Sequence, residues 1–385
     1  MDNSDLRSFR ETLQTLIVES GSSSDVLSQL LGENQACHEL LTGARLPTLS
    51  EATLLGAYFN VDPRILRLEK QPSLGVSLRL GRVDGLHDVT TAVEHATRLL
   101  SVDRLTREWG FKEATENLSS FSPSKTWHDR QAGEITANRL RNFLDMDPIE
   151  PVVDLTEFVE SLGYAVEYRP LPSDVHGISV PEEWDGFTAW IILINSEDGW
   201  GRQRFTLAHE LCHVLQRDAG HVIVDRATVD DRRAERIADS FARHFLLTNE
   251  SVDNALKSYG HVDSWKQAAE LISSLMLNYG ISRDATLIAL RESQDQRVTE
   301  SALDSCSQVP VSTIMRESGR IHDWMEMNQT RGVSFPSARL TTQALDAYSK
   351  GLISLQSVAD VISNGDTLHA ANQLREAGWE DFAGV

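Results

Sequence analysis

Hydrophobic residues at the start of the chain recur with the spacing of amphipathic helices. The first predicted helix carries five apolar residues on one side, namely Leu6, Phe9, Leu13, Leu16 and Ile17. A second predicted helix follows Ser24 as its cap and ends at Gly32, and a third runs to about Thr42, ahead of Gly43. Two helices joined by a tight turn are typical of a helix-turn-helix unit.

A fourth helix is predicted over residues 49–59. It is expected to end there because the proline at position 63 prevents its continuation. Residues 1–75 are therefore predicted to form an all-α domain. The next stretch, 76–131, has mixed helical patterning and contains a serine- and proline-rich run at 119–124. We interpret this stretch as a helical connecting region.

The pattern changes in residues 132–296, which we predict to form an α+β domain. Two helices are predicted first, the second of them over 155–162, and an alternation of apolar and polar residues at 164–168 predicts a strand. The uninterrupted apolar run 189–194 is typical of a buried strand. A Gly-Trp-Gly turn at 199–201 then leads into a further helix.

Residues 297–385 are predicted to be a helical C-terminal region. This region is mostly polar as far as Ala338. Beyond it, apolar residues at helical spacing predict two more helices, and these residues are Leu345, Tyr348, Leu352, Ile353, Leu355, Val358 and Ile362. The sequence indicates no role for this region.

Composition narrows the class of protein. The chain has 385 residues, 41% of them hydrophobic, and a formal net charge of −21. This length and apolar content suit a soluble globular protein, and the charge opposes non-specific attraction to nucleic acid or to an anionic membrane. The sequence contains no pattern typical of a secretory signal and no apolar run long enough to span a bilayer, so we expect a cytoplasmic protein. The three cysteines do not form a disulfide framework and are expected to be reduced.

The strongest chemical signal is the segment His209-Glu210-Leu211-Cys212-His213. In a helix, positions 209 and 213 lie one turn apart on the same face, so both imidazoles can bind one metal ion. Glu210 then lies beside the metal, where a carboxylate can act as the general base of peptide hydrolysis. Two histidines can also share a helix face by chance, but here the preceding residues already continue an amphipathic helix.

A catalytic zinc site needs a third protein ligand, and Glu235 is the predicted one. It lies on a second predicted helix, on which Asp239 is one turn further along and shares its face. Asp239 is therefore placed to accept a hydrogen bond from the other ring nitrogen of a ligating histidine. The alternative interpretation is a solvated charged face.

Three other residues compete for a place at the metal. His244 lies nine residues after Glu235, which puts it on the opposite face of the same helix. His221 could approach from a loop, although an ordinary surface histidine is the simpler interpretation. Cys212 points away from the two histidines and is expected to be a packed, inert thiol.

These segments resemble the ImmA/IrrE family of metallo-endopeptidases. The resemblance rests on Arg-Phe-Thr-Leu-Ala-His-Glu-Leu-Cys-His at 204–213 and Glu-x-x-Ala-Asp-x-Phe-Ala-x-x-Phe-Leu-Leu at 235–247. It also includes Gly177 in a Val-His-Gly-Ile segment and the strand that ends at Asn195, and it covers about residues 132–296. The chain departs from the family pattern at Cys212, where many members have glycine, and at Thr248, where many have proline.

The resemblance implies a fold, a site and a substrate. The fold would be a zincin-like domain with a small sheet and a metal-binding helix. His209, His213 and Glu235 would bind one Zn²⁺ ion, and Glu210 would be the catalytic base. The substrate would be a helix-turn-helix transcriptional repressor, cleaved in response to stress or to a signal from a mobile element.

The N-terminal segment resembles the Cro/C1-type helix-turn-helix domain, with Asn34, Gln35 and His38 as candidate contacts to DNA or to a partner protein. Asn34 or Gln35 could hydrogen-bond to adenine, but no arginine or lysine stands among these residues. Residues 1–75 contain six Lys or Arg and ten Asp or Glu, a net charge of −4. Such a charge is unfavourable for phosphate contact, so protein docking is the alternative to DNA binding.

Taken together, the sequence predicts a zinc-dependent endopeptidase that cleaves a repressor. Two alternatives remain: a DNA-binding transcriptional regulator whose zinc domain is not catalytic, and a protein that sequesters a repressor without cleaving it.

Overall fold

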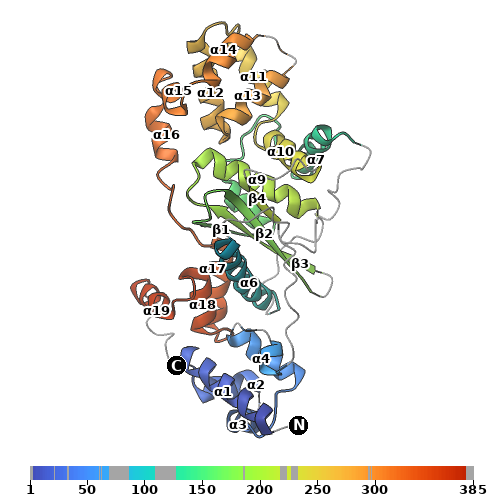
Figure 1. Ribbon diagram of the computed structural model, residues 1–385, viewed down its shortest axis with the longest axis vertical. Helices are drawn as coiled ribbons and strands as arrows, with labels where there is room; N and C mark the ends of the chain where they lie inside the picture. Colours follow the sequence, from blue (N-terminus) through green and yellow to red (C-terminus); the bar gives the residue numbers. More distant parts are fainter. Residues whose placement is uncertain are drawn as a thin grey trace.

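The computed structural model describes residues 3–20, 22–32, 34–59, 61, 63–68, 86–108, 127–184, 187–216, 223–226, 233–293, 295 and 297–378. These residues form an elongated molecule with a β-sheet near its middle (Figure 1). The N-terminal helices lie at one end and a group of helices from the second half of the chain lies at the other. The structure is mostly helical and belongs to the α+β class, as expected.

The N-terminal helices pack around a core of their own. They are α1 (Asn3–Ser20), α2 (Ser24–Leu31), α3 (Asn34–Thr42), α4 (Leu49–Phe59) and α5 (Pro63–Leu66). Buried Phe9, Leu27 and Leu40 contribute to this core. The helices predicted here are confirmed, with one correction: Ser23 rather than Ser24 caps α2, because its side chain accepts the backbone N–H of Val26.

Four strands form one sheet in the order β1-β3-β2-β4. The strands are β1 (Ala165–Arg169), β2 (Val175–Trp184), β3 (Phe187–Asn195) and β4 (Ile223–Arg226). β1 is parallel to β3, whereas β2 is antiparallel to both β3 and β4. The continuous apolar run of β3 is explained by its position, because helices cover it on both faces.

On one face of the sheet lie helices from the middle of the chain. These are α7 (Asp129–Phe143), α8 (Leu155–Ser161), α9 (Trp200–Gln216) and α10 (Arg233–Leu246). Of these, α8 and α9 contact the strands, α10 packs on α9 and α7 packs on α10. Ile192 and Ile194 of β3 share a core with Leu207 and Leu211 of α9. α9 begins at Trp200, so Trp200 and Gly201 belong to its first turn, and the turn predicted at 199–201 lies slightly earlier, at Ser196 and Glu197.

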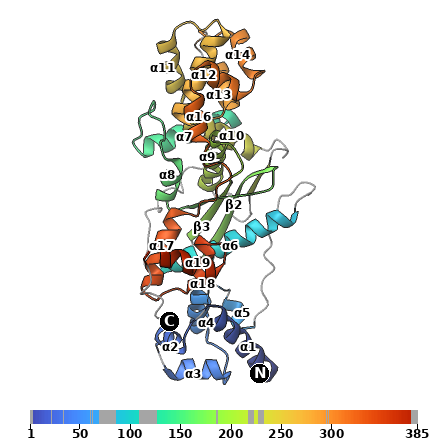
Figure 2. The same cartoon turned by 90° about the vertical axis from the view of Figure 1, so that its left-hand side faces the viewer.

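The opposite face is covered by helices that lie far apart in the sequence. α6 (Leu86–Glu108) crosses this face together with α17 (Ala338–Ser349) and α18 (Leu355–Ile362), and α19 (Thr367–Glu376) packs on α18 (Figure 2). Ile191 and Leu193 of β3 belong to this second core. The described part of the predicted connecting region therefore covers the sheet.

The far end of the molecule consists of short helices. They are α11 (Asn249–Tyr259), α12 (Trp265–Tyr279), α13 (Arg283–Glu292), α14 (Glu300–Ser307), α15 (Val311–Glu317) and α16 (Ile321–Met327). The C-terminal region is helical, as predicted, and the polar stretch before Ala338 contains α14, α15 and α16. Three helices follow it, where two were predicted.

After α16 the chain returns along the sheet to α17. Tyr168 of β1 and Phe335 exchange two backbone hydrogen bonds of 2.9 Å each, so this returning segment pairs with the outer edge of β1. The N-terminal helices contact the same C-terminal helices, since the carbonyl oxygen of Tyr58 accepts the N–H of Ser354 and the hydroxyl of Ser357, each at 3.2 Å. Among the described residues, no helix is long and apolar enough to cross a membrane.

Candidate metal centre

The two histidines of the predicted site lie side by side on α9. Their Nε2 atoms are 3.1 Å apart, and both side chains are buried. Because α9 is helical throughout residues 200–216, the four-residue spacing brings both rings to one face, as the sequence predicts. Both rings therefore direct a nitrogen lone pair toward one point.

Glu235, at the start of α10, completes the group. Its Oε2 lies 3.2 Å from Nε2 of His209 and 3.7 Å from Nε2 of His213. A tetrahedral site with metal–ligand distances of about 2.0–2.1 Å has ligand atoms roughly 3.3 Å apart. The three atoms therefore have the chemistry and the separation of a site with two histidines and one carboxylate, and they can hold a metal ion.

The acidity of Glu235 also fits this role. Burial alone would raise the pKa of its carboxyl, but the hydrogen bonds with His209 and His213 outweigh burial and hold the pKa well below the usual value of 4.5. Glu235 is therefore ionised at neutral pH, as a carboxylate ligand must be.

Asp239 supports the arrangement from behind the first histidine. Its Oδ1 lies 3.0 Å from Nδ1 of His209, while 62% of its side chain remains exposed. A proton on Nδ1 that is donated to Asp239 leaves Nε2 free to bind a metal. The contact has the geometry predicted from the one-turn spacing of Glu235 and Asp239.

Glu210 is fully buried and faces the sheet. Its Oε2 accepts a hydrogen bond of 2.5 Å from the hydroxyl of Ser179 on β2. The neighbouring Gly177 makes this approach possible, because a Cβ atom there would lie 2.9 Å from Oε1 of Glu210 and 2.7 Å from Cγ2 of Thr206. Strand β2 therefore positions the carboxylate beside the histidines of α9.

Ser179 was not predicted from the sequence. The available signal was its position two residues after Gly177, because alternate residues of a strand lie on the same face. That spacing indicates which face Ser179 shares, but it does not indicate that α9 packs on this face. The contact depends on tertiary structure.

The other residues considered as metal ligands are not part of the metal-binding group among the described residues. His244 is buried and its Nδ1 lies 2.7 Å from the carbonyl oxygen of Ser240, and it is not part of the metal-binding group. Cys212 is buried with its Sγ near Nε2 of Gln216. His221 lies outside the described residues. Thr248, where family members often have proline, caps α11 by accepting the N–H of Ser251.

The candidate contacts of the N-terminal domain are separate from this centre. Asn34, Gln35 and His38 are exposed on α3, at the opposite end of the N-terminal helices from the sheet (Figure 1). Nearby, the guanidinium of Arg45 is paired with Glu51 at 2.6 Å and with Glu39 at 2.8 Å. These carboxylates compete with any phosphate for Arg45.

Comparison with known families gives an independent view of this centre. Residues 159–291, roughly a third of the chain, match the IrrE N-terminal-like domain (Peptidase_M78). The matched segment contains the three residues of the metal-binding group as well as Gly177 and Glu210. A search of curated proteins found no match to this chain. The family match does not extend to the N-terminal helices.

The match and the geometry define the class of protein. The chain contains an IrrE N-terminal-like peptidase domain, and within it two histidines and a glutamate form a group that can bind a metal. The protein is an enzyme of the metallopeptidase class.

Proposed function

We propose that the metal is a single zinc ion and that the protein is an endopeptidase. The observation that carries this proposal is the convergence of His209, His213 and Glu235 on one point, with Glu210 next to the first ligand. Two imidazoles and one carboxylate are the protein ligands of many catalytic zinc sites, in which the fourth position is left to water or substrate.

The residues divide the chemistry among them. A zinc ion in this position supplies Lewis acidity, which polarises a peptide carbonyl and makes a water molecule more acidic. Glu210 accepts the proton of the attacking water at its carboxylate and passes it to the departing amine. Ser179 holds that carboxylate in place, and burial of Glu210 keeps competing solvent away from it.

We further propose that the substrate is a helix-turn-helix repressor whose cleavage relieves repression under stress or in response to a mobile element. This proposal draws on the similarity of residues 159–291 to the IrrE N-terminal-like domain and on the helix order of the N-terminal domain. The N-terminal domain would resemble its substrate and dock onto it. DNA binding is the weaker alternative, because Arg45 is already paired with two glutamates.

The metal is tested by mass spectrometry of the purified protein for its elemental content. The wild type should carry zinc, and His209→Ala or Glu235→Ala should abolish or strongly reduce it. His38→Ala is the matched control, since this histidine is exposed on α3 and should leave the zinc content unchanged. Equal zinc in all variants would refute the assignment of the ligands.

The reaction is tested by identifying new protein N-termini in cells that produce either the wild type or Glu210→Gln under a panel of stresses. A new N-terminus within a helix-turn-helix repressor that depends on Glu210 would establish both reaction and substrate. If repression is relieved equally by both proteins and no cleavage is found, the non-catalytic alternatives replace this proposal. Sequence-specific DNA binding that persists in Glu210→Gln would favour the regulator among them.

A further inference from the structure

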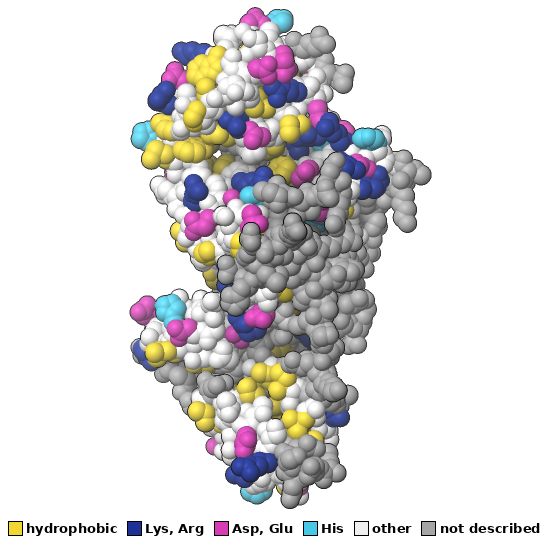
Figure 3. Space-filling view, viewed as in Figure 1, with side chains coloured by type: hydrophobic (Ala, Val, Ile, Leu, Met, Phe, Trp, Pro, Cys, Tyr) yellow, Lys and Arg dark blue, Asp and Glu magenta, His cyan; other side chains and the backbone are white. Residues whose placement is uncertain are grey.

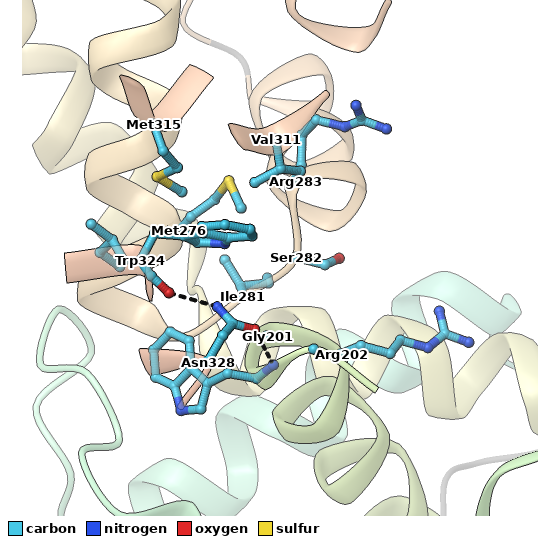
Figure 4. Close-up of a pocket in the computed structure, with 13 residues that line it drawn as sticks. Gly201, Arg202, Met276, Ile281, Ser282, Arg283, Val311, Met315, Trp324 and Asn328 are labelled. Atoms are coloured by element: carbon cyan, nitrogen blue, oxygen red, sulfur yellow. Dashed lines mark hydrogen bonds between the residues drawn. The ribbon is translucent and has the colours of Figure 1, made fainter. Parts of the chain in front are cut away.

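A cavity lies at the start of α9, the helix whose other end carries the metal-binding histidines. It has a volume of about 180 Å³, is partly open to solvent, and is lined by the start of α9, the end of α12, the start of α13 and helices α15 and α16. Its inner wall is apolar and is formed by Met276, Leu277, Ile281, Met315 and Trp324 (Figure 4). None of these residues belongs to the metal centre, so the peptidase chemistry leaves the cavity unexplained.

The cavity is joined directly to α9. Asn328, which follows α16, accepts the backbone N–H of Trp200 at 3.0 Å and donates its amide to the carbonyl oxygen of Trp324 at 2.7 Å. Asn328 therefore links the first residue of α9 to a residue that lines the cavity (Figure 4). A molecule that binds in the cavity and contacts Trp324 is therefore connected, through the hydrogen bonds of Asn328, to the first turn of α9.

Positive charge gathers on one side of the cavity. Arg202 and Arg283 line it, and their guanidinium groups extend toward the same side, away from the apolar wall (Figure 4). These arginines lie in the first turns of α9 and α13, where the helix dipole also favours an anion. Arg283 is paired with Asp284 at 2.8 Å and donates to the carbonyl oxygen of Val309 at 2.7 Å, so its guanidinium is already engaged, whereas the described residues provide no ion-pair partner for Arg202.

The surface around the cavity is also unusually apolar. Hydrophobic side chains gather over α15 and α16 in the space-filling view (Figure 3). Met325 and Met327 of α16 are exposed. The cavity thus adjoins an apolar surface in a protein whose net charge is −21, and Arg202 at its side is a positive charge without an ion-pair partner among the described residues.

We propose that this cavity binds a small aromatic carboxylate and that the bound molecule stabilises the first turn of α9. An apolar cavity of about 150 Å³ can bind benzene, so the volume here accommodates one aromatic ring with a short substituent. The ring contacts Trp324 and the methionines, where stacking and sulfur–aromatic contacts are favourable. The carboxylate lies toward Arg202, on the side of the cavity that the two arginines line.

The proposal is tested with phenylacetate and with its uncharged isostere phenylacetamide. Binding is followed by ¹⁹F NMR of the full-length protein labelled with fluorotryptophan, in which Trp324→Phe identifies the resonance of Trp324. Phenylacetate should shift this resonance in a saturable manner. Phenylacetamide should bind at least about threefold more weakly, because it lacks the negative charge. Equal binding of the two compounds would refute the role of the arginines.

Variants that fill the cavity provide the decisive comparison. Leu277→Trp, or Val311→Phe if the first does not fold, should weaken phenylacetate binding about tenfold or more, since the ring loses its space. Met325→Trp is the matched control, because this side chain is 57% exposed and does not line the cavity. Unchanged binding to the cavity-filling variants would overturn the proposal.

The link to α9 has its own measurement. Phenylacetate should slow hydrogen exchange of the amides at the start of α9, including that of Trp200. Binding without slower exchange there would overturn the stabilisation of α9 by the ligand. None of these measurements uses peptidase activity, so they stand apart from the tests of the proposed function.

Discussion

The two faces of the sheet are built from alternate residues of the same strands, yet they differ in chemistry. Toward α9, strand β2 presents Gly177 and Ser179, which accommodate and bind the carboxylate of Glu210. Toward α6 and α17, the same strand presents Ile178 and Val180, which belong to an apolar core. A bulge between Val175 and Gly177 shifts the alternation, so that Val175 also joins that core.

This chemical difference between the two faces shows how one small sheet can position catalytic residues on one face and stabilise the fold through the other. Buried polar groups cost free energy unless they are hydrogen-bonded, and the face toward α9 contains several such groups around the metal centre. The face toward α6 contains Ala189, Ile191 and Leu193, whose burial stabilises the fold. We therefore expect substitutions on the first face to affect chemistry and substitutions on the second to affect stability.

The largest effect is expected for Glu210→Gln. Loss of the general base should lower the rate of substrate cleavage about 10²- to 10⁴-fold, because the amide cannot take the proton of water. The midpoint of thermal unfolding should not fall, since the glutamine keeps the size of the buried side chain. Cleavage rates on the identified substrate and a melting curve give both quantities. A variant that is active but unstable would contradict the division between the faces.

Leu193→Ala tests the opposite face. Removal of this fully buried side chain should lower the free energy of unfolding by about 2–5 kcal/mol, through lost burial and the cavity left behind. Zinc affinity at a temperature where the variant is folded should equal that of the wild type. Denaturant unfolding and competition with a chelator measure the two. Weaker zinc binding would show that the faces are coupled.

Asp239→Asn should act on the metal alone. Without the carboxylate, His209 is a weaker and less well oriented ligand, and the affinity for zinc should fall about 10- to 100-fold. The side chain is largely exposed, so the unfolding of the metal-free protein should be unchanged. Chelator competition on wild type and variant measures the difference. Equal affinities would exclude Asp239 from the support of His209.

The smallest effect is expected for Ser179→Ala. Glu210 loses one hydrogen bond, and we expect about a tenfold decrease in the cleavage rate. Zinc content should stay at the wild-type level, in contrast to Asp239→Asn. If Ser179→Ala cleaves the substrate as fast as the wild type, the hydroxyl does not position Glu210.

The sequence predicted those parts of the site that depend on a single helix. His209, Glu210 and His213 are separated by fixed helical spacing, and the same holds for Glu235 and Asp239, so a helical assignment was enough to place each set. Ser179 depends on how α9 packs against β2, which no local pattern encodes. That packing also explains why a glycine is needed at position 177.

For the fold, too, the sequence predicted what a local pattern encodes and missed what depends on packing between distant segments. The long apolar run of β3 predicted a buried strand, and the structure confirms it. By contrast, α16 was not placed individually, because it has seven residues and its apolar residues Ile321, Trp324 and Met325 span less than two helical turns, too short a window for a periodic signal. The association of α6 with α17 and α18 joins segments more than 200 positions apart in the chain, and neither segment alone indicates its partner.

The position of α17 and α18 over the sheet, far from β3 in the chain, has a consequence for how the protein is made. The ribosome completes β3 long before it reaches α17, so the apolar face of the sheet waits for its last covering helices while residues 196–337 are synthesised. At about 5–20 residues per second this interval lasts on the order of ten seconds. During translation the nascent chain therefore exposes an apolar surface that, of the helices described on this face, α6 alone can cover, and chaperones have time to bind there.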